Sequence, residues 1–286
     1  MLDRLILPTL GNLTLEELTS SVVREWHSGL QGKVGKTSVR QSYVTLRAIL
    51  STALRDEIIT RHPCQIRGAG SSDCAERPFV SREMAEALAN AMPTDALRAL
   101  VLLKFWACLR LGEVLALRRG DVLERPTKDG RLVTVVRVNK AAVRVASRLV
   151  EGPPKTRESV RDVPLPSQAA AVLRAYLDSE PLAHPTAYLF HAPSGRLFMQ
   201  HEVRKPFHKA QGALGLTGLH LHDLRHGGLT HAALNGATLG QLKSRAGHNS
   251  ARMVAHYQRQ AAELDDRIAD AMSDPDKGAE GLAQGS

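Results

Sequence analysis

The amino-acid sequence predicts a mainly α-helical protein with a small antiparallel β-sheet, which is an α+β fold. Through most of the chain apolar residues recur at intervals of three and four, the period of an amphipathic helix, whereas residues 131–138 alternate and are rich in Val, as in a strand. The length of 286 residues favours two domains. With 43% apolar and 23% charged residues, the composition excludes collagen-like, coiled-coil and wholly disordered chains.

Two helices are predicted in the first part of the chain. Thr14 and Glu17 have the spacing of a capping box, in which each side chain bonds the backbone N–H of the other residue, so a helix should begin there. Apolar residues from Val39 to Ile58 then follow at helical spacing, and Pro63 should end this second helix. We therefore expect a helical domain at residues 1–65.

A linker and a larger domain should follow. Residues 66–76 are rich in small side chains and have no period, which is typical of a flexible linker. The second domain should span residues 77–272, with a disordered tail at 273–286. Its expected helices cover residues 82–92, 95–109, 167–177, 201–211, 222–234 and 251–272, and its expected strands cover 131–138, 143–145 and 160–165.

The positive charge of the chain is concentrated in one segment. The whole chain has a net charge of +9, and residues 98–161 alone contain 15 basic and 6 acidic side chains. Such a segment suggests a polyanionic partner, because Lys and Arg side chains that neutralise phosphates release counterions. A solvated basic face is the alternative interpretation.

Nothing in the sequence indicates a membrane or a secretory route. No apolar run approaches about 18 residues, and the first residues lack the apolar core and cleavage site of a signal peptide. The three cysteines, Cys64, Cys74 and Cys108, have no C-x-x-C spacing, which argues against a disulfide framework and against a cysteine zinc site. We expect a cytoplasmic protein with no membrane partner.

Four short motifs, far apart in the sequence, contain residues suited to phosphate chemistry. They are Arg110 with Glu113, Lys155, His222 with Arg225, and His248 followed nine residues later by Tyr257. Guanidinium groups can donate paired hydrogen bonds to one phosphate, and His222 precedes Arg225 by three residues, which places both on one helix face. Tyr257 is the candidate nucleophile, since a phenol with a pKa of about 10 needs neighbouring cations and a proton acceptor to attack at neutral pH.

These motifs resemble those of the tyrosine recombinase family, in particular the phage integrases of actinobacterial hosts. The similarity rests on residues 108–122, 153–166, 218–226 and 247–257, whose order and separations make the combined signal specific. One departure is Ala246, where a larger apolar residue commonly stands, and it affects local packing only. The resemblance implies a helical core-type DNA-binding domain followed by a catalytic domain.

The resemblance also implies a role for each motif residue. Tyr257 would attack a DNA phosphate and form a 3′-phosphotyrosyl link. The implied supporting groups are the phosphate ligands Arg110, Arg225 and His248, the acid–base residues Lys155 and His222, and the acidic residue Glu113. No cofactor and no metal are implied.

The implied function is site-specific DNA recombination that integrates or excises a phage genome. The implied partners are double-stranded DNA at core-type attachment sites, further copies of the chain in a homotetramer on paired sites, and a directionality factor. Only about 13 residues precede the first predicted helix, so we expect no arm-binding domain unless the sequence is a fragment. An amphipathic helix that ends at Met272 would dock on a neighbouring protomer or pack on its own domain.

Other functions stay open. A chromosome-dimer or plasmid resolvase of the same family would use the same residues on a different DNA site. A DNA-binding regulator that does not cleave would use the same clamp around the duplex. The complete set of six catalytic positions argues against the regulator.

The histidines allow a metal site as a further alternative. His220, His222, His226 and His231 lie within 12 residues and could bind zinc, although the H-E-x-x-H pattern is absent. Without a metal, His226 and His231 are interpreted as structural. The hairpin residues that we expect to face DNA are Thr156, Arg157 and Arg161.

Overall fold

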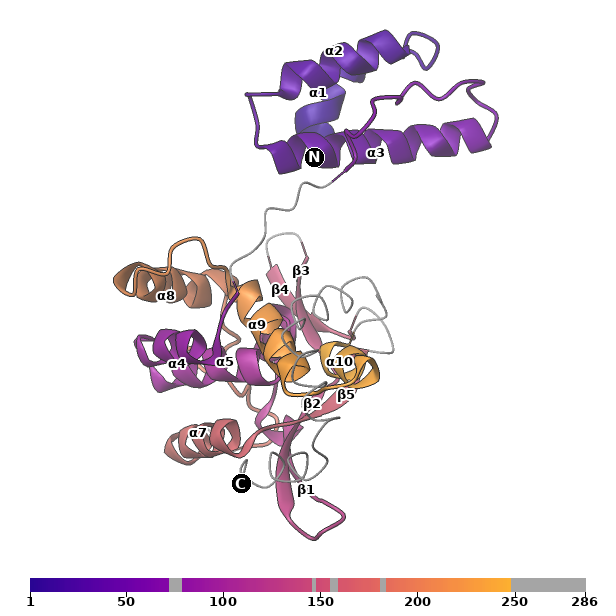
Figure 1. Ribbon diagram of the computed structural model, residues 1–286. Coiled ribbons are helices and arrows are strands. Elements are labelled where there is room, and N and C mark those ends of the chain that lie inside the picture. Colours follow the sequence, from indigo (N-terminus) through magenta and orange to yellow (C-terminus); the bar gives the residue numbers. More distant parts are fainter. Residues whose placement is uncertain (72–78, 146–147, 155–158, 181–183, 248–286) are drawn as a thin grey trace, which may run out of the picture. The chain divides into compact units, whose positions relative to one another are not determined.

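The computed structural model describes residues 1–71, 79–145, 148–154, 159–180 and 184–247. The chain divides into two compact units, Met1–Glu76 and Arg77–Ser286 (Figure 1). Part of the expected linker, the helix expected at 251–272 and the expected tail lie outside the described residues. Helices dominate both units and the strands are antiparallel, so the expected mainly α fold with a small β component is confirmed.

The first unit is built from helices around one apolar core. It contains η1 (a π-helix, Leu2–Ile6), α1 (Leu7–Leu10), α2 (Ser20–Leu30) and α3 (Lys36–Arg55). The indole Nε1 of Trp26 donates a hydrogen bond to the carbonyl of Leu5 at 2.8 Å. The expectation that about 13 residues precede the first helix is wrong, because η1 already begins at Leu2. The apolar side chains of η1 and α1 are part of this core.

The capping box at Thr14 forms, but it does not begin a long helix. The Thr14 N–H donates to Glu17 Oε2 at 2.8 Å, and the Glu17 N–H donates to Thr14 Oγ1 at 3.4 Å. The helix α2 begins only after a second cap, Thr19, whose hydroxyl accepts a hydrogen bond from the N–H of Val22. Leu18 lies between the two caps and is buried. A capping box satisfies the N–H groups of a single turn, so it does not fix where a helix continues.

The helix α3 ends well before Pro63. Glu57 adopts the left-handed conformation, with φ of +58°, and the N–H of Ile58 donates back to the carbonyl of Ala53 at 2.9 Å. This is the hydrogen-bond pattern of a Schellman-type helix end. The helix is therefore ended by the hydrogen bonds of its own last turn and not by the proline. Ile58, which was expected on the apolar face of the helix, lies beyond this end and is 63% exposed.

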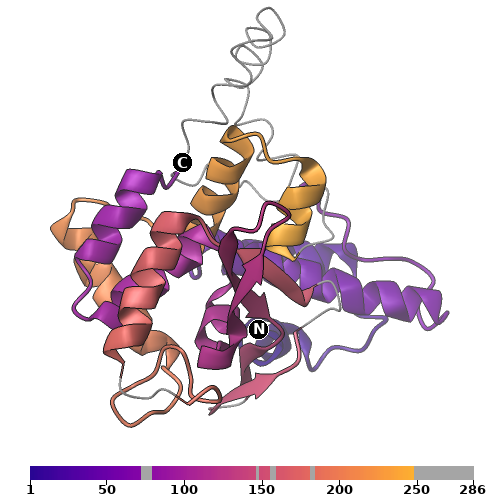
Figure 2. The ribbon, with the colours of Figure 1, turned by 90° about the horizontal axis from the view of Figure 1, so that it is seen from below.

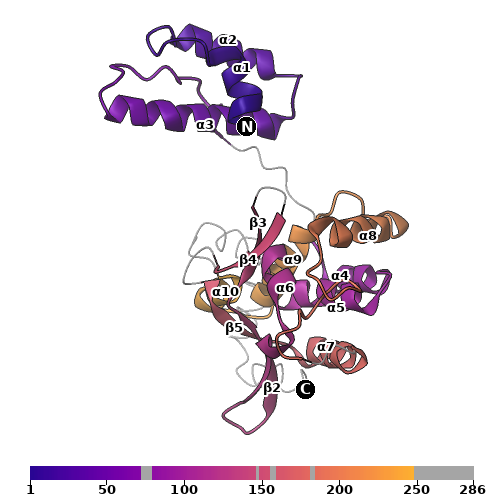
Figure 3. The same cartoon turned by 180° about the vertical axis from the view of Figure 1, so that it is seen from behind.

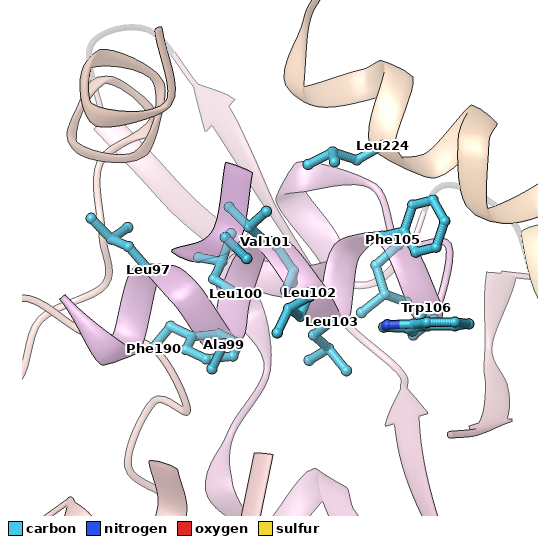
Figure 4. Close-up of a cluster of buried hydrophobic side chains, with 14 of the residues drawn as sticks. Leu97, Ala99, Leu100, Val101, Leu102, Leu103, Phe105, Trp106, Phe190 and Leu224 are labelled. Atoms are coloured by element: carbon cyan, nitrogen blue, oxygen red, sulfur yellow. The ribbon is translucent and has the colours of Figure 1, made fainter. Parts of the chain in front are cut away.

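The second unit is organised around α5 (Asp95–Trp106), a helix that is apolar on all sides. Most side chains from Leu97 to Leu109 are buried, as expected for a helix enclosed by others. Figure 4 shows this core along the length of α5, together with Phe190 and Leu224 from other segments. The helices in contact with α5 are α4 (Arg82–Asn90), α6 (Leu111–Ala116), α7 (Ser167–Ser179) and α9 (Leu221–Leu234).

The described ranges of this unit hold three further helical elements: η2 (Arg119–Asp121), α8 (Gln200–Ala213) and α10 (Leu239–Ala246). The helices α9 and α10 lie side by side (Figure 2). The five helices expected between residues 82 and 234 are all present, with ends shifted by a few residues. The helices α6 and α10 were not expected, because six and eight residues contain too few turns to show a period. No helix in the described ranges is long and apolar enough to cross a membrane.

Within the described segments the strands form two antiparallel sheets, where one was expected (Figure 3). They are β1 (Val122–Pro126), β2 (Leu132–Val138), β3 (Ala141–Val145), β4 (Arg148–Gly152) and β5 (Arg161–Pro164). One sheet has the order β1-β2-β5, and β3 pairs with β4 in a separate hairpin. Val163 of β5 lies opposite Val136 and both are buried, whereas Val143 of β3 is exposed. Burial therefore selects β5 as the partner of β2.

Candidate active site

Arg110 and Glu113 meet at the start of α6. Arg110 is the N-cap residue, and its N–H donates to Glu113 Oε2 at 2.8 Å. A Glu at the third helical position reaches back to the cap in this way, so the spacing of the two residues itself brings them together. The Arg110 side chain also donates from Nη1 to Glu113 Oε1 at 2.6 Å and from Nη2 to the carbonyl of Gly247 at 3.1 Å. The Arg110 side chain is 32% exposed, whereas that of Glu113 is 3% exposed.

Arg225 of α9 is completely buried next to Glu113. Its guanidinium donates from Nη1 to the carbonyl of Cys108 and from Nη2 to the carbonyl of Ala246 at 2.5 Å. Nη1 also lies 3.8 Å from Glu113 Oε2. Burial, followed by the charge of Arg110, lowers the pKa of Arg225 to about 10, so the group is still a cation at neutral pH. Two carbonyls from distant segments therefore fix the orientation of this charge.

The carbonyl of Cys108 reaches Arg225 because the chain turns sharply after α5. Cys108 has φ of +53°, a left-handed conformation that residues other than glycine seldom adopt. Two glycines of α9 allow this helix to approach: a Cβ on Gly228 would lie 2.0 Å from the carbonyl oxygen of Phe105, and one on Gly227 would lie 2.3 Å from that of Val80. Close packing of α9 on α5 thus places Arg225 beside the Cys108 turn.

Arg161 is part of the same cluster, and the sequence interpretation missed it. It was expected to face DNA from a hairpin, but its side chain is only 5% exposed and points at Glu113. Nη1 and Nη2 donate to Glu113 Oε1 at 3.3 Å and to Oε2 at 3.0 Å. The signal that could have found it is the strand alternation, since Arg161 shares the buried face of β5 with Val163. Thr156 and Arg157 lie outside the described residues.

Among the residues that the structure describes, the cluster carries an excess of positive charge. Three guanidiniums, those of Arg110, Arg161 and Arg225, lie within 4 Å of the single carboxylate of Glu113. Burial opposes ionisation of Glu113, but the hydrogen bonds and charge of Arg161 together with Arg110 outweigh it and hold the pKa of Glu113 below its usual value. The carboxylate is therefore ionised, and three cations against one anion suit a site that binds a second anion.

His222 lies at the beginning of α9, which Asp223 starts by accepting a hydrogen bond from the N–H of His220 at 2.7 Å. The His222 side chain is exposed, and its ring centroid lies 4.6 Å from that of His226 in an edge-to-face arrangement. Arg225 follows in the next turn and is buried. The helix therefore carries an exposed imidazole above a buried guanidinium.

The zinc alternative finds no site in the described part of the chain. There, no group of three or more His, Cys, Asp or Glu side chains is arranged to hold a metal ion. His231 packs against the ring of Trp106, with centroids 5.4 Å apart, and burial lowers its pKa. A neutral histidine among aromatic rings agrees with the structural role expected for His231.

Three of the expected catalytic residues, Lys155, His248 and Tyr257, lie outside the described residues. Two of these residues directly follow described residues in the sequence. Pro154, two residues after the end of β4, precedes Lys155. Gly247, which precedes His248, caps α10 in a left-handed conformation with φ of +57° and accepts the hydrogen bond from Arg110.

The other three tyrosines have packing roles. Tyr43 and Tyr176 are buried, and burial raises the pKa of each. Tyr188 lies under the guanidinium of Arg118, 4.4 Å from its ring centre, and burial raises its pKa as well. A raised pKa makes a phenol a poorer nucleophile at neutral pH, so none of these three tyrosines is activated for attack.

A basic surface adjoins α8. The solvent-facing side chains of this helix include His201, Arg204, Lys205, His208 and Lys209. Four of them line one surface cavity together with Arg144 of β3. Glu202 of the same helix is engaged by Arg196, at 2.7 Å, so it does not offset this charge fully. The face is suited to a polyanion.

Comparison with known proteins matches these features to one family. The model of the phage integrase family matches residues 78–263. The integrase of Mycobacterium phage L5 is 32% identical over 273 residues, which cover 95% of this chain and 71% of that protein. The integrase of Mycobacterium phage FRAT1 is 31% identical over 271 residues, which cover 94% of this chain and 79% of that protein.

Solved structures agree on the fold. The Tn1549 transposon integrase in complex with a circular intermediate DNA has a TM-score of 0.74 and 16% identity, covering 91% of this chain and 88% of that one. A lambda integrase dimer bound to a core site has a TM-score of 0.62 and 15% identity, covering 89% of this chain and 68% of that one. With a family match over most of the chain and integrase relatives above 30% identity, the protein belongs to the phage integrase family.

Proposed function

We propose that the protein is a site-specific DNA recombinase that integrates or excises a phage genome through a covalent tyrosine–DNA intermediate. The observation that carries this proposal is the convergence of Arg110, Arg161 and Arg225 on Glu113, next to the chain segment that leads to His248. The integrase relatives and the DNA-bound neighbours of the same fold support it.

The proposed substrate is double-stranded DNA at core-type attachment sites. The net charge of +9 within residues 98–161 and the basic face of α8 favour a partner with many phosphates. Arg144 of β3 and Arg204 of α8 line the same cavity, so two elements would contact one stretch of duplex backbone.

In the proposed reaction the phenol oxygen of Tyr257 attacks a phosphorus atom of the DNA backbone. A P–O bond to the tyrosine forms, the P–O5′ bond breaks, and the products are a 3′-phosphotyrosyl link and a free 5′-hydroxyl. Lys155 would give a proton to the leaving 5′-oxygen, and His222 would take the phenol proton or hold the phosphate. The 5′-hydroxyl of a partner strand then attacks the link and releases the tyrosine. The link conserves the phosphodiester, so this cycle uses no nucleotide cofactor.

Arg110, Arg225 and His248 would stabilise the charge that develops on the phosphorane. Such stabilisation is greatest when the donors are oriented before the reaction begins. Arg225 is held by two backbone carbonyls and Arg110 by Glu113 and Gly247, which is the arrangement this role requires.

Assembly on paired sites would complete the function. We propose a homotetramer on two sites, with the segment that ends at Met272 docking on a neighbouring protomer and a directionality factor selecting integration or excision. Truncation after Arg259 should leave single-site binding intact and impair the paired complex and strand exchange. Light scattering of the complexes and a recombination assay test this role. Normal assembly and exchange by the truncated protein would exclude it.

Covalent trapping tests the cleavage activity itself. Duplexes selected for binding from a randomised pool are nicked near the bound site, so that cleavage releases a short fragment and traps the intermediate. The wild type should form an adduct that survives denaturing electrophoresis, also in the presence of EDTA, because cationic side chains supply the charge at the phosphate. Tyr257→Phe should bind the same duplex and form no adduct. Binding without any adduct from the wild type would instead indicate a DNA-binding regulator.

A further inference from the structure

The β3–β4 hairpin, which precedes Lys155 in the sequence, needs an anchor other than strand pairing. Within the described residues it pairs with no further strand, and a two-stranded hairpin alone is only marginally stable. Val143 and Val150 are exposed, Leu149 is half-buried, and Ala142 at the base of the hairpin is buried. The contacts that fix the hairpin are therefore concentrated at its base.

On β3 the anchor is a close backbone contact with α6, which lies beside this strand (Figure 3). A Cβ on Gly112 would lie 2.6 Å from the carbonyl oxygen of Ala142, so the approach requires a glycine at this position. Gly112 stands between Arg110 and Glu113 in the sequence. One strand of the hairpin thus rests on the first turn of α6, where the arginine cluster is built.

On β4 the anchor is an ion pair. Glu151 lies opposite Ala142 in the strand register, and its Oε2 accepts a hydrogen bond from Arg118 Nη2 at 2.7 Å. The two side chains are 27% and 24% exposed, so solvent screens this pair less than it screens a fully exposed one. Lys140 Nζ lies 4.0 Å from Glu151 Oε1. The strand that precedes Lys155 is therefore tied to the segment that follows α6.

Arg118 is itself held in one orientation. Its guanidinium donates from Nη1 to the carbonyl of Thr186 and lies over the ring of Tyr188, 4.4 Å from the ring centre. Its backbone N–H donates to Asp121 Oδ2 at 2.8 Å, and its backbone forms an antiparallel bridge with Tyr188. A guanidinium with a partner at each terminal nitrogen and a ring on its face fixes the position of the carboxylate that it binds.

We propose that the ion pair of Arg118 and Glu151 positions Lys155 for protonation of the leaving 5′-oxygen. Glu151 precedes Lys155 by only four residues. Pro153 and Pro154 stand between them, and their fixed φ angles transmit the position of the strand. A general acid must come within hydrogen-bond reach of the leaving oxygen, so a hairpin that shifts against α6 would slow cleavage. This inference rests on the proposed function and assigns Arg118 no contact with DNA.

A leaving group that needs no proton isolates this role. In a nicked duplex whose leaving 5′-oxygen is replaced by sulfur, at the cleavage position mapped with the wild type, the P–S bond breaks. A thiolate leaves without protonation, because a thiol is a much stronger acid than an alcohol. On the oxygen duplex, Arg118→Met should form adduct roughly 10- to 100-fold more slowly than wild type in a single turnover, with duplex affinity unchanged. On the sulfur duplex it should react within about threefold of the wild-type rate.

The rescue has a clear set of contrary outcomes. Equal slowing of Arg118→Met on both duplexes would show a structural role without positioning of the acid. A loss of affinity that accounts for the loss of rate would show a DNA contact. Lys155→Ala should be rescued by sulfur in the same way, and a Lys155→Ala protein that stays slow on the sulfur duplex would show that Lys155 is not the acid. Each of these results would overturn the proposal.

Arg82→Met is the matched control. Arg82 also pairs with a carboxylate, that of Glu86 at 2.9 Å, and lies over an aromatic ring, that of Trp106 at 6.0 Å. It belongs to α4, which lies apart from the hairpin (Figure 1). Arg82→Met should therefore cleave both duplexes at the wild-type rate, and slowing equal to that of Arg118→Met would contradict a role specific to the hairpin anchor.

A double variant tests the ion pair itself. Glu151→Gln should also slow cleavage of the oxygen duplex and be rescued by sulfur. Combined with Arg118→Met it should be no slower than Arg118→Met alone, because both substitutions remove the same contact. Losses that multiply would mean that the two residues act separately, against the proposal. Arg118→Lys should recover part of the rate, because an ammonium keeps the charge beside Glu151 and loses the fork that also reaches Thr186.

Hydrogen exchange distinguishes failure of this inference from failure of the proposed function. Amides of residues 141–152 should exchange faster in Arg118→Met than in wild type and in Arg82→Met. If the wild type forms no adduct on either duplex, the proposed function fails and the role in protonation fails with it, whereas exchange still decides whether Arg118 anchors the hairpin. Unchanged exchange in Arg118→Met would contradict the anchor, whatever the cleavage assay shows.

Discussion

Lys104 donates a hydrogen bond from Nζ to the carbonyl oxygen of Leu109, 2.9 Å away, from a position with no solvent exposure. The lysine belongs to the apolar helix α5, and the carbonyl that it holds immediately precedes Arg110. Burial, followed by the charge of Arg225, lowers the pKa of Lys104 to about 7. A group close to half protonation at neutral pH therefore lies under the arginine cluster.

This burial predicts a pH dependence of stability. As the pH rises from 7 toward 10.5, Lys104 loses its proton in the folded protein before it does so in the unfolded chain, so the unfolded state binds more protons. The free energy of unfolding should then rise with pH relative to Lys104→Met, by up to about 4 kcal/mol between pH 7 and 10. Guanidinium unfolding of both proteins at several pH values measures the difference. Lys128→Met, which removes an exposed lysine, should follow the wild type. A constant difference between wild type and Lys104→Met would show that the lysine is not perturbed.

Arg225→Lys should abolish most of the cleavage although it keeps the charge. A lysine ammonium cannot donate at once to the carbonyls of Cys108 and Ala246 in the fixed geometry of a guanidinium fork. We expect the rate of adduct formation to fall at least about 100-fold, with duplex affinity nearly unchanged. Arg174→Lys, at an exposed arginine that pairs with Glu124, should cleave normally. A fully active Arg225→Lys protein would mean that the charge alone suffices.

Gly228→Ala should destabilise the second unit. Its Cβ would lie 2.0 Å from the carbonyl oxygen of Phe105, so α9 would have to move away from α5. The expected loss is at least about 2 kcal/mol in the free energy of unfolding. Gly240→Ala is the matched control, since its Cβ would meet nothing within 4 Å and the residue lies in α10. That variant should gain up to about 1 kcal/mol, measured by the same denaturant titration. Equal effects of the two substitutions would contradict the close packing of α9 on α5.

Duplex binding should weaken steeply with salt. Neutralising Arg204 and Lys205 of α8 to Gln should lower affinity for all duplex sequences and reduce the slope of log affinity against log salt by about 1 for each phosphate interaction removed. Fluorescence anisotropy at several salt concentrations gives the slope. A wild-type slope near zero would exclude a phosphate-binding surface, and an unchanged slope in the variant would place that surface away from α8.

The sequence predicted the part of the site that depends on local spacing. Arg110 and Glu113 meet because helix capping joins residues at this spacing. Arg225 Nη1 lies 3.8 Å from Glu113 Oε2, as expected if the motifs that contain these residues form one site. Arg161 was misread because a charged residue in a Val-rich strand is usually exposed. Its partners Glu113 and Arg245 are 48 and 84 residues away, so only the tertiary fold shows that it is buried.

The same limit applies to the strands and to the first unit. Val143 and Val163 both lie in Val-rich segments, and which of the two segments joins β2 is decided by burial against the core. Thr14 and Glu17 made their predicted hydrogen bonds without starting a long helix, because the chain is capped again at Thr19. In both cases the sequence predicted the local structure, namely a strand or a capping box. Which strand pairs with β2, and where a long helix begins, depended on contacts with distant residues.

The identity of the residue joined to DNA tests the proposed recombinase chemistry most directly. Adduct trapped on a nicked duplex is digested with protease and nuclease, and mass spectrometry locates the nucleotide-bearing residue and the end of the strand to which it is attached. We predict Tyr257 linked to a 3′-phosphate, with a free 5′-hydroxyl on the released fragment. Attachment at Tyr43, Tyr176 or Tyr188, attachment at a residue other than tyrosine, or a link to a 5′-phosphate would contradict the mechanism.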